Sequence, residues 1–258
     1  MGTDKRERQK ANRQLKLEEM ARDARKRKTK KRGLQIGLGV PLLIVVVFGA
    51  IRLFAPEDNK SVNTGATTTS GVPGQPLACP NEDGTSPATH TFPAAPTMCI
   101  DTAKIYTVKV TTSLGAYTAV LDAKKAPLTV NSFVYLARYH YFDNTPCHRI
   151  IPGFVIQCGD PTGSGTGGPG YSFKDELPAA GEYKLGSLAM ANSGANTNGS
   201  QYFVISGNDG IALPPKYSLF GQVTEGLDVV TKLDAAGTAG AGTPSTPVTI
   251  NSVTVTQS

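Results

Sequence analysis

Alternating apolar and polar residues mark a series of short strands in the second half of the chain. Residues 106–110 and 117–121 alternate with a period of two on either side of a turn at 113–115, which predicts a β-hairpin. Further strands are predicted at 186–191, 200–205, 217–223 and 248–255. The last of these changes phase at Asn251 and Ser252, which indicates a β-bulge.

Two helices interrupt the strands. The first follows Pro127, where four apolar residues are spaced as one face of a helix: Val130, Phe133, Val134 and Ala137. The second is predicted from about residue 224 to residue 233, with three apolar residues facing inward: Leu227, Val230 and Leu233. Many short strands accompanied by two helices are typical of a closed β-barrel.

A hairpin near the middle of the chain carries polar residues at strand positions. Two apolar runs meet at Pro152 and Gly153, a pair that favours a tight turn. Arg149 and Gln157 lie within the flanking strands, where charged and amide side chains are uncommon. One interpretation is a half-exposed hairpin whose polar residues face water. The other is a sheet face that presents a cation, an amide and apolar neighbours to a ligand.

The chain contains four cysteines, Cys79, Cys99, Cys147 and Cys158. An even number in an exported domain suggests two disulfides, although four cysteines allow three pairings. Proximity in the sequence favours Cys79 with Cys99 and Cys147 with Cys158.

The register of the central hairpin bears on the second pair. A two-residue loop would place Cys147 directly opposite Cys158, at a separation that a disulfide can span. A three-residue loop would instead place Arg149 opposite Gln157 and turn the two cysteines to opposite faces. Both arrangements hold together only if the hairpin contains a bulge.

The charge of the chain is unevenly distributed. Residues 1–33 carry fourteen Lys and Arg against five Asp and Glu, a net charge of +9, whereas the remaining residues carry twelve against fifteen, a net charge of −3. The basic character therefore belongs to a tail, and a nucleic-acid partner is not expected.

The region before the predicted barrel divides into three parts. We predict a basic cytoplasmic tail at 1–32 and a transmembrane helix at 33–54, because residues 33–51 lack charge and approach the ~30 Å of a bilayer core at ~1.5 Å per residue. A cleaved signal peptide fits less well, since the basic region is long and no small-residue cleavage site follows. Residues 55–102 are rich in Pro, Thr, Ser and Gly and predict a disordered linker. The folded domain, 103–258, then lies outside the cytoplasm.

The common catalytic patterns are missing from the sequence. The glycines at 163–168 match G-x-G-x-x-G in form, but prolines stand on both sides of them in place of a strand and a helix, so a folded loop is favoured over a nucleotide site. No metal-binding spacing and no nucleophile elbow is present, and we expect neither a metal nor a cofactor. His148, next to Arg149, could serve as an acid–base group, but a strand histidine directed away from its neighbour's face is equally consistent with a structural role. A cationic, amide-rich and aromatic site without a nucleophile suits a reaction that breaks no bond.

Several of these motifs together resemble the cyclophilins, which are peptidyl-prolyl cis–trans isomerases. The resemblance is carried by residues 148–160, 165–168, 190–203 and 220–221, and it extends over about residues 103–257. It implies a closed, eight-stranded antiparallel β-barrel with two capping helices. It also implies an enzyme that rotates X-Pro peptide bonds without a cofactor.

The resemblance also implies a set of site residues. Arg149 matches the catalytic arginine of the family, and the implied peptide-binding residues are Phe154, Val155, Gln157, Gly165, Ala191, Asn192, Gln201, Phe203, Leu213 and Tyr217. Three departures from the usual pattern weaken the expected binding of cyclosporin more than catalysis: Val155 replaces Met, Tyr217 replaces His, and the usual Trp position falls near Ala212.

The expected activity is therefore that of a membrane-anchored bacterial isomerase that acts on proline-containing segments of exported proteins and assists their folding. A second hypothesis from the same sequence is a binding module that holds proline-containing segments with little turnover. A binding assay combined with a rate assay separates the two.

Overall fold

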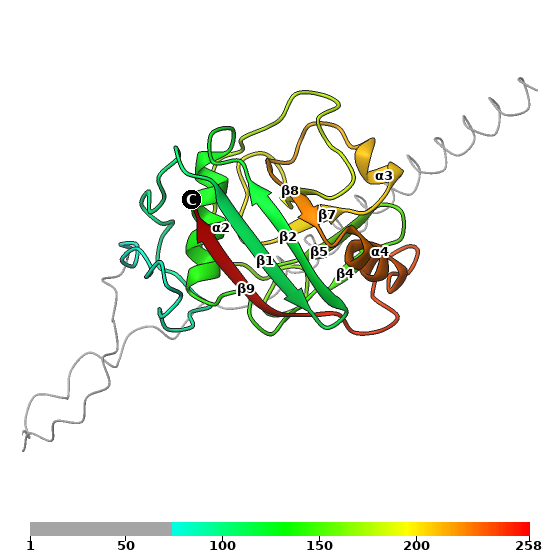
Figure 1. Cartoon of the computed structure of the whole chain (residues 1–258), viewed down its shortest axis with the longest axis horizontal. Helices are drawn as coiled ribbons and strands as arrows, with labels where there is room; N and C mark the ends of the chain where they lie inside the picture. Colours follow the sequence, from blue (N-terminus) through cyan, green and yellow to red (C-terminus); the bar gives the residue numbers. More distant parts are fainter. Residues whose placement is uncertain (1–73) are drawn as a thin grey trace, which may run out of the picture. The chain divides into compact units, whose positions relative to one another are not determined.

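The computed structural model describes residues 74–258 (Figure 1). The predicted tail at 1–32, the predicted transmembrane helix at 33–54 and the first part of the predicted linker lie outside the described residues. Within 74–258, no helix has the length and apolar character needed to cross a bilayer.

The described part of the chain is mainly β, as predicted. Nine strands form one antiparallel sheet: β1 (Tyr106–Thr112), β2 (Gly115–Leu121), β3 (Thr145–Pro146), β4 (Arg149–Ile151), β5 (Val155–Cys158), β6 (Ser187–Met190), β7 (Tyr202–Ile205), β8 (Leu219–Glu225) and β9 (Thr249–Gln257). Their order in the sheet is β3-β9-β1-β2-β8-β6-β7-β5-β4. The predicted hairpin of β1 and β2 is confirmed, with Tyr106 paired to Leu121 and Thr112 to Gly115.

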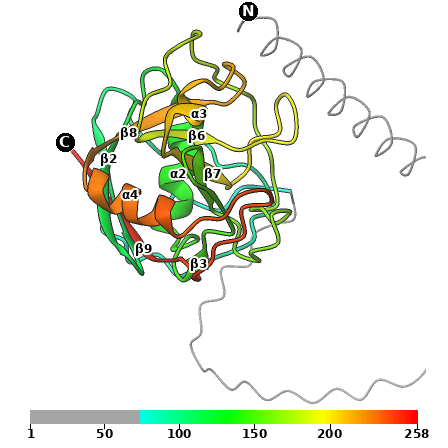
Figure 2. The same ribbon diagram turned by 90° about the vertical axis from the view of Figure 1, so that its right-hand side faces the viewer.

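The sheet is curled, and it differs from the predicted closed barrel of eight strands. Its two end strands, β3 and β4, are separated in the sequence only by Cys147 and His148, so the curl brings the two ends of the sheet together along the chain. Figure 2 shows β3 at one end of the sheet, near β9. The backbone pairing is interrupted at Cys147 and His148. Residues 145–151 therefore form two strands, β3 and β4, where a continuous pairing would have made them one. Among the described strands, β3 pairs with β9 and β4 pairs with β5.

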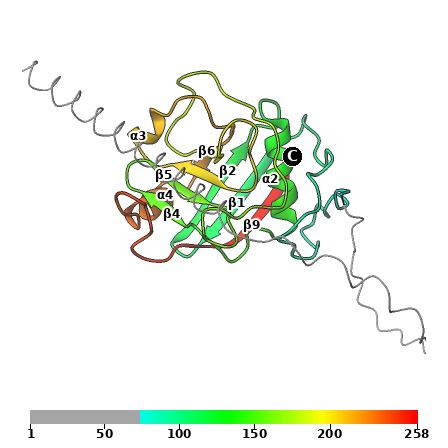
Figure 3. The ribbon, with the colours of Figure 1, turned by 180° about the vertical axis from the view of Figure 1, so that it is seen from behind.

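Three helices accompany the sheet, α2 (Pro127–Arg138), α3 (Asn208–Ile211) and α4 (Leu227–Ala235), and α2 and α4 lie at opposite ends of it (Figures 1 and 3). Helix α2 begins at Pro127, and the carboxylate of Glu176 accepts hydrogen bonds from the backbone N–H groups of Leu128 and Thr129 at 2.9 and 2.8 Å. These bonds satisfy two of the donors that a helix start leaves unpaired. The one-turn helix α3 was not predicted.

Helix α4 starts later than the sequence pattern indicated. Strand β8 continues to Glu225, and Gly226 turns the chain with a φ of +79° before the helix begins. The predicted inward positions Val230 and Leu233 are buried, but Leu227 is 42% exposed, because it lies at the first residue of the shifted helix. The prediction for Leu227 is therefore wrong.

Aromatic side chains fill the interior of the curled sheet. Phe133 of α2 packs against Phe142, Phe220 and Tyr202 with ring centres 4.9, 5.2 and 5.3 Å apart. The four positions predicted to form the inner face of α2 are all buried: Val130, Phe133, Val134 and Ala137. Attraction between the rings, stacked with Phe142 and edge to face with Tyr202, adds to the burial of apolar area. Most other residues of α2 are buried as well, so the spacing identified the helix and four of its buried positions, whereas the burial of its remaining sides was not predicted.

The predicted bulge in the last strand is confirmed. Thr111 pairs with Ser252 and Thr112 pairs with Ile250, so Asn251 is the extra residue on β9. Both predicted disulfides, Cys79–Cys99 and Cys147–Cys158, are also present.

The register alternatives of the central hairpin are resolved by the interruption between β3 and β4. Arg149 pairs with Gln157 and Ile151 with Val155, so the loop has three residues. Cys147 nevertheless reaches Cys158, with their Cα atoms 4.0 Å apart, because Cys147 lies beyond the end of β4 and does not follow its alternation. An opposed Arg149 and Gln157 therefore coexist with the disulfide.

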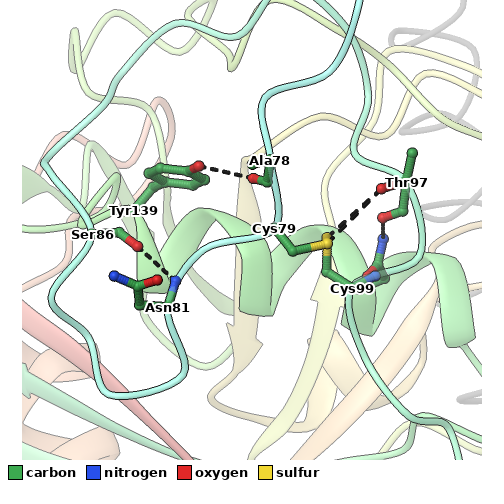
Figure 4. Close-up of a disulfide and its surroundings, with 8 residues drawn as sticks. Ala78, Cys79, Asn81, Ser86, Thr97, Cys99 and Tyr139 are labelled. Carbon is green, nitrogen blue, oxygen red and sulfur yellow. Dashed lines mark hydrogen bonds between the residues drawn. A yellow bond between two sulfur atoms is a disulfide. The ribbon is translucent and has the colours of Figure 1, made fainter. Parts of the chain in front are cut away.

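Residues 74–102, predicted as part of a disordered linker, pack onto the folded domain. Phe92 is 1% exposed, Ile100 is buried, and Cys79–Cys99 closes a loop over α2 (Figure 4). The segment contains little regular structure, in line with its composition. The buried ring of Phe92 and hydrogen bonds from Asn131 and Tyr139 attach the segment to the domain, which the composition alone does not indicate.

Candidate active site

The β4–β5 hairpin holds the candidate catalytic cation. Arg149 and Gln157 stand directly opposite each other, and Arg149 Nη1 donates a hydrogen bond of 3.3 Å to Gln157 Oε1. The guanidinium carbon lies 5.7 Å from the ring centre of Phe154, a separation at which cation and ring attract. The half-buried Arg149 side chain is therefore oriented along the sheet face.

The amide of Gln157 connects this cation to a second glutamine. Gln157 Nε2 donates to Gln201 Oε1 at 2.9 Å, and Gln201 Nε2 donates to the carbonyl of Gly167 at 2.9 Å. Each amide thus has its oxygen and nitrogen assigned by its neighbours. The chain of bonds fixes the orientation of both side chains relative to Arg149.

Five predicted pocket residues form one apolar cluster beside Arg149, together with Ala191: Phe154, Val155, Phe203, Leu213 and Tyr217. Val155 and Phe203 are buried at its base, whereas the other three are half-buried at its outer side. Phe203 and Tyr217 meet edge to face with ring centres 5.3 Å apart. An apolar surface of this kind suits a small saturated ring.

Tyr183 supports the cluster from below, and it was missed at the sequence level. Its hydroxyl donates to the carbonyl of Tyr217 at 2.7 Å and accepts from the backbone N–H of Tyr217 at 3.1 Å. Burial raises the pKa of Tyr183, which keeps the phenol protonated and able to donate. The two residues are 34 positions apart, and no local motif signals the contact.

The turn between β4 and β5 is held by two helices. The backbone N–H of Gly153 donates to a carboxylate oxygen of Asp234, in α4, at 2.9 Å. A Cβ on Gly210 of α3 would lie 2.3 Å from the carbonyl oxygen of Phe154, so this helix approaches the turn as closely as glycine allows. Neither support was predicted. These two contacts fix the position of Phe154 relative to the sheet. Because Leu213 lies two residues after the end of α3, they also fix the position of Leu213.

A polar cavity of about 710 Å³ adjoins the apolar cluster. Five of the predicted site residues line it: Gln157, Gly165, Ala191, Asn192 and Gln201. Ala191 belongs to both the cavity and the cluster, and Gln157 carries the hydrogen bond to Arg149, so the two parts meet there. The side-chain amide of Asn192 donates to the carbonyl of Lys216 at 2.9 Å, which fixes the position of this lining residue.

The glycine-rich loop beside the cavity encloses a carboxylate of the protein itself. Asp160 is fully buried, and it accepts hydrogen bonds from the backbone N–H groups of Thr162, Gly165 and Gly167 at 2.8, 2.7 and 3.0 Å. A Cβ on Gly167 would lie 2.0 Å from Asp160 Oδ1, which explains the glycine there. The expected folded loop is confirmed, since this loop's amides already hold an anion.

Burial by itself would raise the pKa of Asp160, but the hydrogen bonds from Thr162, Gly167 and Gly165 outweigh burial and lower the pKa to about 2. The carboxylate is therefore ionised at neutral pH and organises the wall of the cavity. This role of Asp160, three residues before the first glycine of the loop, was not predicted from the sequence.

His148 lies beneath the same loop, where a Cβ on Gly165 would be 3.6 Å from its ring. Burial lowers the pKa of His148, so the imidazole is neutral at neutral pH. Over residues 74–258 no group of three acidic, cysteine or histidine side chains is arranged to hold a metal ion. The arrangement as described can bind a peptide and stabilise a polar group beside an apolar ring.

Comparisons with known proteins match this part of the chain. A sequence model described as "Cyclophilin type peptidyl-prolyl cis-trans isomerase/CLD" matches residues 107–255. The chain is 44% identical over 165 residues to a probable peptidyl-prolyl cis-trans isomerase B of Mycobacterium tuberculosis, covering 57% of this chain and 53% of that protein. It is 41% identical over 161 residues to the protein of the same name from Mycobacterium leprae, covering 55% and 54%. The chain thus spans about half the length of these relatives.

Solved structures give the same match. A crystal structure of a cyclophilin-type peptidyl-prolyl cis-trans isomerase from Cryptosporidium parvum has a TM-score of 0.54 and 31% identity, and the match covers 59% of this chain and 98% of that one. A second structure of that protein, determined in the presence of the dipeptide Ala-Pro, has a TM-score of 0.53 and 31% identity, covering 58% and 98%.

Proposed function

The chain belongs to the cyclophilin-type peptidyl-prolyl cis–trans isomerase family, and on this premise we propose that residues 103–258 catalyse rotation about X-Pro peptide bonds. The observation that carries the proposal is the position of Arg149, half-buried, hydrogen-bonded to Gln157 and next to an apolar cluster that matches a proline ring in character.

The chemistry required is modest. Rotation about a peptide bond faces a barrier of ~18–20 kcal/mol because of amide resonance. For X-Pro the two isomers differ by only about 0.5–1 kcal/mol, so both exist and interconvert slowly. A catalyst therefore has to stabilise the twisted amide, in which the nitrogen has lost resonance and become pyramidal and basic.

Arg149 performs this stabilisation in the proposed mechanism. Its guanidinium donates to the prolyl nitrogen as it becomes basic, or to the prolyl carbonyl oxygen. Gln157 and Phe154 hold the guanidinium in place before the substrate arrives, so little reorganisation accompanies the reaction. No covalent bond forms and no proton is transferred.

The remaining site residues hold one part of the bound peptide still while the other part rotates about the X-Pro bond. Phe154, Phe203 and Leu213 grip the proline ring, while Asn192 and Gln201 hold the backbone that must not turn. Excluding water from the apolar cluster strengthens the hydrogen bonds between the site and the substrate. It also removes the solvation by water that stabilises the planar, more polar ground state of the peptide bond.

Rate and binding measurements on the same peptide test this function. We expect the full chain at catalytic concentration to accelerate cis–trans exchange of a proline-containing peptide in a protease-coupled assay. Binding of the peptide without any acceleration would favour the alternative, a module that holds proline segments with little turnover.

The rate should be nearly independent of pH near neutrality. We expect kcat/KM to vary by less than about twofold between pH 6.5 and 8.5, because the guanidinium stays cationic and the buried His148, whose pKa is lowered, stays neutral throughout this range. A pH-rate series with one peptide measures this. A bell-shaped profile would instead point to an acid–base group and contradict a mechanism without proton transfer.

We also propose that the domain works outside the cytoplasm, anchored through residues 33–54 to the lipid bilayer as a single-pass protein with a cytoplasmic N-terminus. The uncharged stretch in the sequence and the two disulfides of the described residues support this, because disulfides persist in oxidising compartments. The substrates are then proline-containing segments of exported proteins, whose folding the enzyme assists.

Thiol labelling tests the proposed location. Protein extracted from its natural compartment and denatured without reductant should show no reactive thiol, and four after reduction, because both pairs are oxidised. Four reactive thiols before reduction would place the domain in a reducing compartment. The same proposal includes weak cyclosporin binding, because the exposed Ala212 offers no indole for the drug to contact.

A further inference from the structure

Residues 74–102, which we call the N-terminal strap, are attached to the domain by several independent contacts. Asn131 of α2 accepts a hydrogen bond from the backbone N–H of Cys99 at 2.7 Å and donates to the carbonyl of Thr97 at 2.8 Å. Tyr139 donates to the carbonyl of Ala78 at 2.8 Å, and the Cys79–Cys99 disulfide joins the two ends of the strap (Figure 4). The strap is thus fixed to α2 along its length.

The centre of the strap is anchored by one ring. Phe92 is 1% exposed and lies among four tyrosines, with ring centres 5.1 to 6.3 Å away: Tyr135, Tyr139, Tyr141 and Tyr171. Burial of a phenylalanine side chain among aromatic rings is favourable, so this contact holds the strap against the domain.

The backbone of Phe92 also contacts the wall of the polar cavity. Its N–H donates to the carbonyl of Pro169 at 2.8 Å, and a Cβ on Gly170 would lie 2.5 Å from its carbonyl oxygen. Pro169, Gly170 and Tyr171 are also among the residues that line the cavity. The strap is therefore in direct contact with the segment that forms this wall.

A second set of contacts reaches the cavity next to Gln201. Tyr141, which packs on Phe92, makes a 2.8 Å hydrogen bond to the hydroxyl of Ser200, and Ser200 donates to the carbonyl of Gly159 at 2.7 Å. Ser200 lines the cavity directly before Gln201 in the sequence. Displacing Phe92 would thus disturb the cavity at two places.

We infer that the N-terminal strap is a specificity-determining element of the enzyme. It fixes the cavity that receives a side chain flanking the proline of the substrate. The inference rests on the proposed function. The family match covers residues 107–255, so the strap lies outside the matched residues.

The cavity also indicates which side chains it favours. It adjoins the apolar cluster at Ala191, so a peptide whose proline lies on the cluster extends a neighbouring residue into the cavity. Among the described residues that line it, the polar groups are amides, hydroxyls and backbone atoms, and none is charged. A long, uncharged polar side chain such as glutamine matches this lining, whereas glycine makes no use of it.

The test compares paired proline peptides that carry Gln or Gly at each position flanking the proline. For the full chain we expect the Gln peptide to be favoured at one position by about tenfold in kcat/KM. Phe92→Ala should reduce this ratio to near one, chiefly by raising KM for the Gln peptide, with kcat for the Gly peptide retained. Phe92→Leu should keep part of the preference.

Two further variants keep the result interpretable. Cys79→Ser with Cys99→Ser loosens the strap while leaving Phe92 in place, and it should also lower the Gln/Gly ratio. Val229→Ala removes buried volume from α4, away from the strap, and should keep the ratio while lowering the melting temperature.

An unchanged ratio in the Phe92 and cysteine variants, or an equal loss in Val229→Ala, would overturn the inference while leaving the proposed function intact. A full chain that accelerates none of the peptides would refute the proposed function itself, and this inference with it.

Discussion

Replacing Arg149 with alanine is expected to lower kcat/KM for a proline peptide by roughly 10²–10³-fold, the usual cost of removing a preorganised donor to a transition state. The loss should appear in kcat, because the guanidinium bonds the twisted amide more strongly than the planar one. A protease-coupled assay measures the rate, and thermal unfolding should show a nearly unchanged midpoint, because the side chain is only half-buried.

Two variants frame that result. Arg149→Lys keeps a positive charge but loses the planar fork that contacts Gln157 and Phe154, so an intermediate activity is expected. Lys232→Ala removes a cation from an exposed pair with Asp228 and should leave the rate unchanged. If Arg149→Ala retained the activity of the unaltered chain, the assignment of this residue would be wrong.

Among the substitutions proposed for this protein, replacing Asp160 with alanine is expected to lower the free energy of unfolding the most. The fully buried carboxylate satisfies three backbone N–H groups of the glycine loop, and removing it leaves these donors unpaired. A cost of about 3 kcal/mol lowers the unfolding midpoint by roughly 6–12 °C in a domain of this size. Because the loop lines the cavity, KM should rise as well.

The pKa of Asp160 gives the same prediction a pH dependence. Its folded-state pKa of about 2 is below the usual value near 3.9, so its contribution is present above about pH 4 and is lost as the pH falls toward 2. The contribution is about 2–3 kcal/mol at neutral pH. Denaturant unfolding at several pH values measures it.

Asp160→Asn should remove the stabilisation that the carboxylate provides at neutral pH. The decrease in the free energy of unfolding between pH 4 and pH 2 should become smaller by the same amount. The control is Asp228→Asn, since the carboxylate of Asp228 is exposed on α4 and lies outside the glycine loop. If Asp160→Ala unfolded at the temperature of the unaltered chain, the loop would not depend on its internal carboxylate.

The parts of the fold that the sequence predicts are those fixed by local periodicity. The β1–β2 hairpin, the inner face of α2 and the bulge at Asn251 each follow from the spacing of apolar residues over a few positions. The division into β3 and β4 does not, because the interruption at Cys147 and His148 arises from pairing with two different strands, β9 and β5. Periodicity within one strand carries no information about such a change of partner.

The residues that hold the site in place and were not predicted make contacts between distant parts of the chain. Tyr183 reaches Tyr217, and Asp234 reaches Gly153 across 81 positions, so neither appears in a local pattern. Phe92 is an isolated aromatic residue in a stretch rich in Pro and Thr, and its burial depends on rings from α2 and the loops beyond it. Composition predicts disorder for such a segment, whereas the buried ring and the hydrogen bonds from Asn131 and Tyr139 hold it against the domain.

The residues of the candidate site were predicted mainly from the resemblance to a family. The pattern of apolar and polar residues alone predicted fewer of them. An arginine and a glutamine at strand positions indicated a functional face, and the pairing of Arg149 with Gln157 bears out one of the two registers considered. The grouping of Phe154, Phe203 and Leu213 came only from the resemblance, because they belong to three separate segments of the chain.

The most direct test of the central claim is two-dimensional exchange NMR on one proline peptide, with the full chain and with Arg149→Ala at equal bound fractions. The account predicts strong cis–trans exchange peaks with the unaltered chain. With the variant these peaks should be nearly absent, although line broadening shows that the peptide still binds. Equal exchange at equal binding would mean that the guanidinium does not lower the barrier to rotation, and the proposed mechanism would be wrong.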